Sequence, residues 1–541
     1  MDGQPNLDRF ASRRSTAYGS RGMVATSQPL AAEAGLETLR DGGNAFDAAV
    51  ATAAVLNVVE PMSTGLGGDA FALYRTADGD VGAMRACGGA PADATLERTR
   101  EAVAAQTGAD PAEATMPERG PLTVTVPGAP RGWEATVAEF GRRSLADALA
   151  PAVRYAREGF PVTEVIASQW AACEPELRND AARETYLVDG ERAPRVGEVV
   201  TNEPMARTLE TLAQAGADPF YEGEIAKQIA DAVQSRDGLL QQSDLAGFSP
   251  EFPEPVSTTY GGAEVYELPP NNQGLIALEA LNVAEELGVP GATDPVERTH
   301  RLVEATKLAF HDGHHYITDP DYEEVPPLGS ESWAAERAAA VGDEALAPEA
   351  VGVMDSPAED ADTVLLTVAD DAGNVVSFIN SIFKGFGSGV VAGDTGITLQ
   401  NRGASFSLDP DHPNVVEPGK RPFHTLLPAL VRFDDADWAA FGVMGGFMQP
   451  QGHVQVLSNL LDRDMPLQAA LDEPRWRYAA DGSLAVEARF DDDLASKLAR
   501  RGHDVSVELP VQFGGAQVAR NRDGVLSGAT EPRKDGTVST F

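Results

Sequence analysis

The sequence predicts an α/β fold built as one layered body. Helical patterns dominate the first part of the chain, and paired short strands with Gly-rich turns follow residue 363. No Gly- or Ser-rich linker separates the two parts. Because helices and strands bury their apolar faces against each other, this order favours layers of helix on sheet over two separate domains.

The elements of the first part can be placed from their apolar spacing and their Gly and Pro stops. We expect, in order, a strand over 23–26, a helix over 29–40, an Ala-rich helix from 44 to about 58, a Gly-rich loop over 65–69, a strand over 70–74, short amphipathic helices between about 132 and 240, and helices over about 275–287 and 296–315.

The second part begins at Thr363. Residues 347–362 are acidic and rich in Ala and Pro, without an apolar period. Apolar runs over 363–369 and 375–379 then flank a turn and predict a buried hairpin. A loose segment that feeds a hairpin opening with a hydroxyl residue suggests that the chain is cut there. Such a cut would place a free α-amine beside the Thr363 hydroxyl, which pairs a nucleophile with a base. Helices are expected later, near 449–462 and 491–501.

Charge is the most unusual property of the composition. The 541 residues include 83 Asp and Glu against 42 Lys and Arg, a net charge of −41, and the acids are spread along the chain. Such a surface suits high salt, where repulsion between carboxylates is screened. We therefore predict adaptation to a saline cytoplasm, with an acidic partner-binding surface as the rival interpretation. The same charge argues against nucleic acid and anionic membranes as partners.

The cysteines and the N-terminal residues indicate the compartment. Cys87 and Cys173 form no CxxC pair, so a disulfide framework is not expected. The first ten residues lack the basic-then-apolar pattern of a signal peptide, and no apolar run reaches the roughly 18 residues of a membrane helix. These observations favour a cytoplasmic protein, and they leave its oligomeric state open, a homo-oligomer included.

An ordered set of short motifs covers nearly the whole chain. In order they are Gly42-Gly-Asn-Ala-Phe-Asp-Ala-Ala49, Gly65-Leu-Gly-Gly68, Pro269-Pro-Asn-Asn-Gln-Gly274, Asp362-Thr363, Gly385-Phe-Gly-Ser-Gly389, Pro418-Gly-Lys-Arg-Pro422, Gly445-Gly446 and Asp472-Glu-Pro-Arg475. The set resembles the γ-glutamyltranspeptidase family. This resemblance implies a four-layer αββα sandwich of the N-terminal-nucleophile hydrolase type. It also implies a proenzyme that cuts itself between Asp362 and Thr363 into segments 1–362 and 363–541, which together form one domain.

The resemblance also implies roles for individual residues. Thr363 matches the nucleophile that forms an acyl-enzyme. Ser381 matches the residue whose hydroxyl hydrogen-bonds that nucleophile. Gly445 and Gly446 match the oxyanion hole, where two backbone N–H groups face the developing negative charge.

The substrate-binding positions depart from typical members of the family. His424 and Thr425 stand where two serines bind the substrate carboxylate. The carboxylate-binding arginine is displaced by two residues, to Arg85. Ser405 replaces the acid that holds the substrate α-ammonium, and Arg402 stands at a position that is usually acidic or amide. The segment 407–419 is shorter than usual, which indicates that the lid over the site is missing. These departures favour anionic acyl groups over γ-glutamyl and resemble the branch of cephalosporin-acylase-like members.

Three histidines offer a metal-site hypothesis. His311, His314 and His315 lie at i, i+3 and i+4 of an expected helix, a spacing that can bind zinc. The family resemblance gives this helix no metal, so we expect a solvated helix end and neither metal nor cofactor.

The leading hypothesis is a self-cleaving enzyme that transfers a γ-glutamyl or related acyl group from a small amide to water or an amine, as in glutathione hydrolysis. One alternative keeps this chemistry for another acyl group, such as glutaryl. A second alternative, from another class, is an uncut protein that serves as a non-catalytic binding scaffold.

Overall fold

Two antiparallel β-sheets form the centre of the computed structural model, which describes residues 14–347 and 363–541. The six-stranded sheet has the order β18 (Thr537–Thr540), β2 (Gly22–Thr26), β9 (Val364–Asp370), β10 (Val375–Ser381), β3 (Asp69–Arg75) and β4 (Val81–Ala86). The seven-stranded sheet has the order β1 (Ala17–Gly19), β17 (Val525–Thr530), β16 (Gly515–Arg522), β12 (Asp437–Met444), β11 (Pro428–Asp434), β8 (Ala263–Glu267) and β7 (Val256–Tyr260). Each sheet contains strands from both sides of residue 363.

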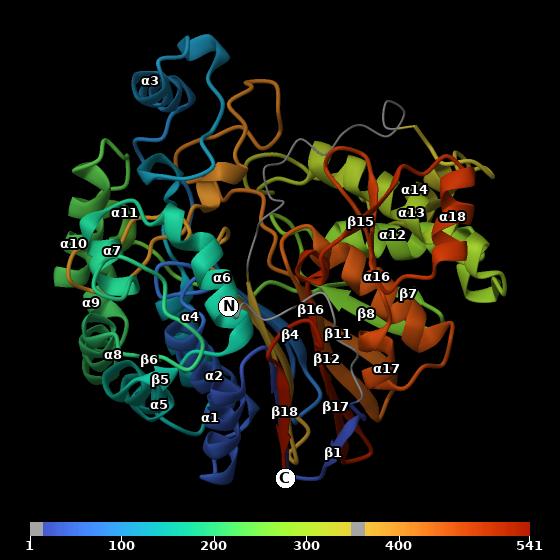
Figure 1. Ribbon diagram of the computed structural model, residues 1–541, viewed down its shortest axis with the longest axis horizontal. Helices are drawn as coiled ribbons and strands as arrows, with labels where there is room; N and C mark the ends of the chain where they lie inside the picture. Colours follow the sequence, from blue (N-terminus) through green and yellow to red (C-terminus); the bar gives the residue numbers. More distant parts are fainter. Residues whose placement is uncertain (1–13, 348–362) are drawn as a thin grey trace, which may run out of the picture.

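Helices cover the outer face of each sheet (Figure 1). Against the six-stranded sheet and one another pack α1 (Pro29–Arg40), α2 (Ala45–Val59), α4 (Ala129–Phe140), α5 (Leu145–Glu158), α6 (Glu164–Cys173), α8 (Glu203–Ala215) and α10 (Glu224–Gln234). The other side carries α12 (Gly274–Glu286), α13 (Pro295–Tyr316), α14 (Glu331–Ala338), α16 (Met448–Leu461) and α17 (Leu467–Asp472). The arrangement confirms the expected four layers, αββα.

Shorter elements complete the structure. They are α3 (Leu96–Thr107), α7 (Asp180–Tyr186), α9 (Asp218–Tyr221), α11 (Gln242–Ala246), α18 (Asp492–Arg500), a two-stranded sheet of β5 (Phe160–Pro161) and β6 (Val199–Val200), and a three-stranded sheet of β13 (Trp476–Tyr478), β14 (Leu484–Glu487) and β15 (Val505–Glu508).

The central helix α2 is buried along its whole length, as its Ala-rich sequence predicts. Its N-terminus is closed by a capping box, in which Asn44 accepts from the backbone of residue 47 and Asp47 accepts from the backbone of residue 44. Asp47 also accepts from the backbone N–H groups of Arg142 and Arg143. One short motif therefore starts a core helix and ties it to the turn between α4 and α5.

Successive side chains of β9 and β10 point to opposite faces of the sheet and therefore pack into two different cores. Val364, Leu366 and Phe378 face the helices of the first layer. Leu365 and Ile379 face the seven-stranded sheet, in a third cluster that lies between the sheets. Thr363 has the same parity as Leu365, so its side chain points into the space between the two sheets.

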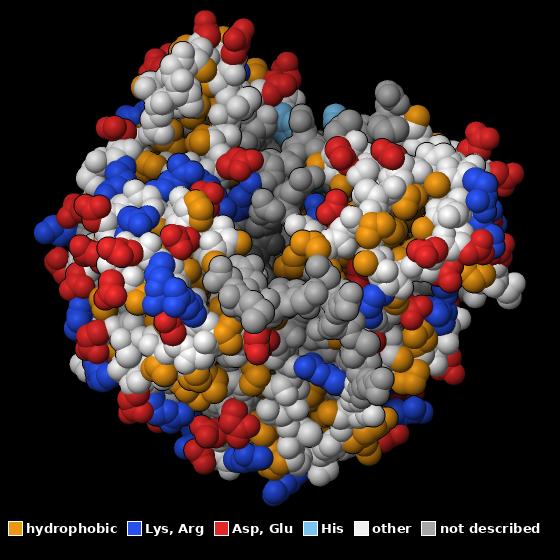
Figure 2. Space-filling view, viewed as in Figure 1, with side chains coloured by type: hydrophobic (Ala, Val, Ile, Leu, Met, Phe, Trp, Pro, Cys, Tyr) orange, Lys and Arg blue, Asp and Glu red, His pale blue; other side chains and the backbone are white. Residues whose placement is uncertain are grey.

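On the face shown in Figure 2, the acidic side chains are not gathered into one patch. Figure 2 shows Asp and Glu around the whole visible face, interspersed with Lys and Arg. Within residues 14–347 and 363–541, no helix is both long enough and apolar enough to cross a bilayer.

Candidate active site

Thr363 and Ser381 lie side by side at the end of the central hairpin. Thr363 immediately precedes β9, Ser381 ends β10, and their hydroxyl oxygens are 3.3 Å apart. Both side chains are buried. The structure thus brings together the two hydroxyl residues that the sequence analysis assigned to the nucleophile and its neighbour. Asp362, on the other side of the expected cleavage site, lies outside the described residues.

In the antiparallel register, this pair of side chains is followed by others on the neighbouring strands, which form a row across the sheet. Ser381 pairs with Asp69, the first residue of β3. The pairing of Ala70 with Ala86 then sets Asp69 beside Cys87. Because paired residues of antiparallel strands share one face, all four side chains point into the space between the sheets. A carboxyl group therefore lies one strand away from the hydroxyl pair.

Asp69 is a site residue that the sequence analysis missed. It is completely buried and accepts hydrogen bonds from Gly128 N–H at 3.1 Å, Gln400 Nε2 at 3.1 Å and His424 Nε2 at 3.0 Å. Burial raises the pKa of Asp69 to about 7, although the charge of Arg402 opposes this shift. The signal in the sequence was an acid at the end of a Gly-rich loop, directly before an apolar strand.

His424 is a neutral partner of Asp69. Its Nδ1 accepts from the backbone N–H of Leu426 at 3.2 Å, so the ring proton resides on Nε2 and is donated to Asp69. Burial, and then the positive charges of Arg402 and Arg85, lower the pKa of His424 well below its ordinary value. His424 therefore orients the Asp69 carboxyl group instead of presenting a positive charge to a substrate.

Arg402 places a buried cation next to the hydroxyl pair. Its Nη2 is 3.5 Å from Ser381 Oγ, its Nη1 donates to Thr425 Oγ1 at 2.8 Å, and its guanidinium stacks over the Phe383 ring. Burial lowers the pKa of Arg402 to about 10, which still leaves it charged at neutral pH. No carboxylate among the described residues forms an ion pair with it, and its Nε has no hydrogen-bond partner there. The geometry favours binding of an anion here.

Gly445 and Gly446 form the turn between β12 and α16. Their φ angles are +113° and +53°, and a side chain on Gly445 would meet the Cα of Gly514 at 3.0 Å. Ser377 Oγ donates to Phe441 O, and Gly442 packs against Leu365, so β12 ends beside the end of β10. Neither glycine N–H donates a hydrogen bond to any residue that the structure describes. Two unengaged amides at this end of the sheets match an oxyanion hole.

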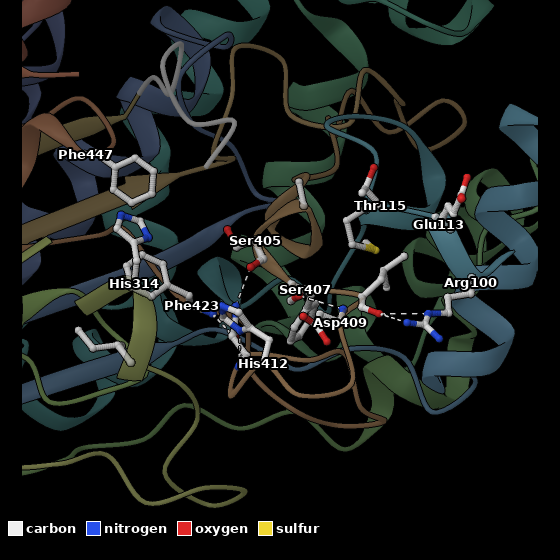
Figure 3. A pocket seen from close by; sticks show the side chains of 18 residues that line it. Arg100, Glu113, Thr115, His314, Ser405, Ser407, Asp409, His412, Phe423 and Phe447 are labelled. Carbon is white, nitrogen blue, oxygen red and sulfur yellow. Dashed lines mark hydrogen bonds between the residues drawn. The ribbon is translucent and has the colours of Figure 1, made fainter. Parts of the chain in front are cut away.

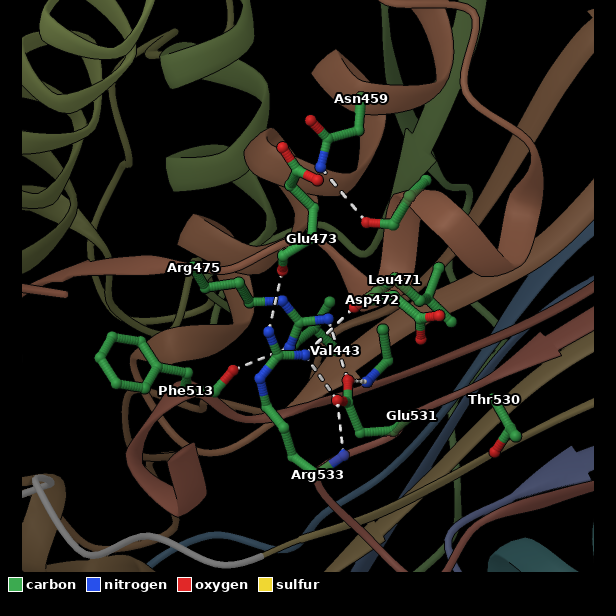
Figure 4. A network of polar contacts seen from close by, with 12 residues as sticks. Val443, Asn459, Leu471, Asp472, Glu473, Arg475, Phe513, Thr530, Glu531 and Arg533 are labelled. Atoms are coloured by element: carbon green, nitrogen blue, oxygen red, sulfur yellow. Dashed lines mark hydrogen bonds and ion pairs between the residues drawn. The ribbon is translucent and has the colours of Figure 1, made fainter. Parts of the chain in front are cut away.

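A buried ion network holds Phe513, which precedes the glycine that packs against this turn (Figure 4). Arg475 donates to Phe513 O at 2.8 Å and pairs with Glu531 at 2.9 Å, and Arg533 also pairs with Glu531. Burial alone would raise the pKa of Glu531, but the two arginines outweigh it and hold the pKa below its ordinary value. The network fixes the segment that includes Gly514, which packs directly against Gly445.

Two predicted substrate-binding residues, Arg85 and Ser405, contact other groups. Arg85 is buried, and its guanidinium pairs with Glu251 at 2.5 Å and donates to Pro270 O at 2.6 Å. Ser405 lies on the wall of a cavity, where its carbonyl accepts from Asn414. Arg85 is thus already neutralised by a carboxylate, whereas Arg402 is not. The short segment after Ser405 lines the same cavity.

The expectation of a solvated histidine cluster on α13 is wrong for His314. His311 and His315 are exposed, but the His314 ring is packed by Phe310, Phe423 and Phe447. The reason is that the apolar stripe of α13 continues to this residue, under the loops that carry the two later phenylalanines.

A different group of residues, two on α13 and one just after α18, comes closest to metal-ligand spacing. In the described part of the chain, His300, Glu304 and His503 bring their ligand atoms within 4.8 Å of one another. The two imidazoles contact each other at 2.9 Å, and Lys307 donates to Glu304 at 2.8 Å. The ammonium of Lys307 supplies the positive charge that a metal ion would bring. The cluster binds Gly342 O and Leu346 N–H, and so attaches the segment around 342–346 to α13.

The four-layer fold has hydroxyl, carboxyl and glycine residues at the ends of its central sheets. This is the architecture of the N-terminal-nucleophile hydrolases. The model of the γ-glutamyltranspeptidase family matches residues 31–541. The chain is 37% identical to the glutathione hydrolase-like YwrD proenzyme of Bacillus subtilis, over 97% of this chain and 99% of the relative. It is 36% identical to the oxamate amidohydrolase proenzyme of Klebsiella pneumoniae, over 97% and 100%.

A solved structure agrees with these matches. The cephalosporin acylase of Bacillus halodurans superposes with a TM-score of 0.90 and 44% identity, covering 100% of this chain and 99% of that one. The chain therefore belongs to the γ-glutamyltranspeptidase family.

Proposed function

We propose that this protein is a self-cleaving amidase and acyltransferase that uses Thr363 as its nucleophile. Cleavage between Asp362 and Thr363 gives segments 1–362 and 363–541, which stay together because both contribute hydrogen-bonded strands to each sheet. Names of its relatives support the proposal, since the Bacillus subtilis and Klebsiella pneumoniae proteins are described as proenzymes.

The observation that carries the proposal is the position of the Thr363 hydroxyl. It lies at a strand end between two sheets, 3.3 Å from Ser381 Oγ and on the side where the Gly445–Gly446 turn ends β12. A nucleophile held by a rigid sheet can meet a carbonyl group without further ordering of the chain. A threonine that only packed in the core would need neither a second hydroxyl beside it nor the N–H groups of the Gly445–Gly446 turn.

The same hydroxyl serves both reactions. In the precursor, the Thr363 hydroxyl attacks the carbonyl carbon of Asp362, and its proton passes to the Thr363 nitrogen as the C–N bond breaks, which frees the α-amine. Water then hydrolyses the resulting ester and restores the hydroxyl. During attack on a substrate amide, the α-amine accepts the hydroxyl proton and returns it to the leaving amine. Gly445 and Gly446 N–H stabilise the oxyanion, and Ser381 orients the nucleophile. Water, or an acceptor amine, finally releases the acyl group.

The charges around Thr363 favour an acyl group that carries a carboxylate. Arg402 is the buried cation nearest to the hydroxyl pair and has no carboxylate partner among the described residues. No acid stands at Ser405 to hold an α-ammonium. We therefore propose that γ-glutamyl amides are turned over no better than amides of simple dicarboxylic acids such as glutaryl or oxalyl. The name of the Klebsiella pneumoniae relative, an oxamate amidohydrolase, supports this assignment.

Electrophoresis under denaturing conditions with N-terminal sequencing tests the central proposal. We expect two fragments, the smaller of which begins at Thr363, and a Thr363→Ala variant that remains one polypeptide. An active protein that runs as a single intact chain would overturn the proposal and favour the scaffold alternative. Turnover of γ-glutamyl and glutaryl anilides then separates the two acyl assignments.

We also propose that the protein works in a saline cytoplasm. The support is the excess of 83 acidic over 42 basic residues and the even distribution of the acids over the visible surface.

A further inference from the structure

A cavity of about 560 Å³ opens beside the proposed catalytic residues (Figure 3). Its walls continue the segments that form the site. Phe447 directly follows Gly446, Phe423 directly precedes His424, and Ala404 and Ser405 follow Arg402 two and three residues later. A group bound in this cavity therefore lies next to the oxyanion turn and the buried cation.

One wall of the cavity is aromatic and rigid. The rings of His314 and Phe423 stack with centroids 5.4 Å apart, and Phe447 meets His314 edge to face at 4.7 Å. Figure 3 shows these three residues together on one side of the cavity, apart from Arg100, Glu113 and Thr115. Burial lowers the pKa of His314 to about 4, so the wall is uncharged at neutral pH. Such a wall suits a flat apolar group.

The opposite wall disfavours anions. Glu113 and Asp409 are exposed at the rim. Arg100 is the only Arg or Lys among the described lining residues, and its Nε and Nη2 both donate to Leu408 O. A carboxylate would thus meet two acids and an engaged cation in the cavity, whereas Arg402, which is buried and does not line the cavity, offers it a cation. These charges favour the carboxylate end of a substrate near Arg402 and an end without negative charge in the cavity.

We propose that this cavity is the amine site of the enzyme, and that it selects neutral or cationic amines with a flat aromatic or apolar group, both as leaving groups and as acceptors. The inference rests on the proposed acyl-enzyme at Thr363. Two arguments assign the cavity to the amine. One is the charge of its walls. The other is that the amine leaves while the acyl group stays bound to the enzyme, so the amine needs the part of the site that opens to solvent.

Acyl transfer to pairs of amines tests this site. The mature wild-type protein is given its best acyl donor with benzylamine or with 2-methoxyethylamine, a primary amine of similar basicity. We expect transfer to benzylamine to be faster by about tenfold, the order of the gain from aromatic contacts. We expect 4-(aminomethyl)benzoate, which adds a carboxylate to benzylamine, to lose most of this advantage. For a protein that only hydrolyses, the KM values of amides of the same amines give the comparison.

Four variants locate the effect. His314→Ala should reduce the preference for benzylamine to near one, while His314→Phe should retain it because the ring stack is kept. Phe423→Leu is a second disruption of the same wall, and His315→Ala, on the exposed face of α13, is the matched control that should behave as wild type.

The outcomes distinguish this inference from the function on which it rests. A protein that cleaves itself and turns over amides, but prefers neither amine or keeps its preference in both His314→Ala and Phe423→Leu, contradicts the amine site alone. A protein that neither cleaves itself nor turns over any amide contradicts the proposed function and the inference with it.

Discussion

Asp69 and Ser381 stand directly opposite each other on the neighbouring antiparallel strands β3 and β10. This register puts a buried carboxyl group one strand away from the hydroxyl pair of Thr363 and Ser381. His424, Gln400 and Gly128 hold that carboxyl group by hydrogen bonds. The charge of Arg402 opposes the rise in its pKa that burial causes. The pair thus connects the proposed nucleophile to an ionisable group that titrates near neutral pH.

Loss of the Ser381 hydroxyl should slow both self-cleavage and turnover. Ser381→Ala removes the partner that orients Thr363, and one such hydrogen bond is worth about 1–3 kcal/mol, or roughly 5- to 150-fold in rate. Rates of fragment formation and of anilide hydrolysis measure the effect. Thr367→Val is the matched control, since its buried hydroxyl on the same strand face has no hydrogen-bond partner in the described structure. An equal loss in both variants would show that only packing matters.

The affinity for anionic acyl donors should fall as the pH rises through about 7. Deprotonation of Asp69 adds a negative charge near Arg402 and weakens its attraction for a carboxylate. The KM of glutaryl anilide should therefore rise above neutral pH, and the KM of a neutral acyl anilide should stay constant. Asp69→Asn should flatten the profile of the anionic substrate. A wild-type profile that is identical for both substrates would exclude this role of Asp69.

The raised pKa of Asp69 should also make the stability of the protein fall as the pH rises. The pKa of Asp69 is raised from 3.8 to about 7 in the folded state, so folding favours its protonated form. This contribution is fully present below pH 3.8 and is lost as the pH rises to about 7. The melting temperature of Asp69→Asn minus that of the wild type should accordingly increase over this pH range and level off above it. A constant difference would show that Asp69 ionises normally.

A side chain at Gly445 should disable the oxyanion turn. Its φ of +113° and the 3.0 Å approach to Gly514 force the turn to move in Gly445→Ala. Displacing one amide donor typically costs about 10²- to 10³-fold in kcat. Gly262→Ala is the control, because Gly262 also has a positive φ, +83°, but open space around it. That variant should lose about 1 kcal/mol of stability and no activity, so equal activities of the two variants would argue against the oxyanion assignment.

Salt should be required for full activity and stability. With a net charge of −41, unscreened carboxylates repel one another in dilute buffer, whereas the Debye length shrinks to about 3 Å at 1 M salt. We expect activity and melting temperature to rise together with KCl concentration. Full activity and stability in dilute buffer would contradict halophilic adaptation.

Local patterns were sufficient for much of the fold. The expected helix over 29–40 is α1, with Pro29 at its first position and Gln28 as its N-cap. The hairpin of 363–369 and 375–379 is β9–β10, because two apolar runs around the turn Asp370-Asp-Ala-Gly-Asn374 have few other ways to bury themselves. The hairpin of β7 and β8 was not predicted, since its half-exposed strands carry a weak apolar signal.

The sequence by itself supplied the candidates for the nucleophile, its partner hydroxyl and the glycine turn, because the ordered motifs that contain them resemble those of one family. Only the tertiary structure decided which charges meet. It joined Arg85 to Glu251, left Arg402 without a carboxylate partner among the described residues, and paired Asp69 with His424 across 355 positions of the chain. Contacts of this kind depend on sheet register and burial, where a shift of one residue would turn the same side chains to the opposite face.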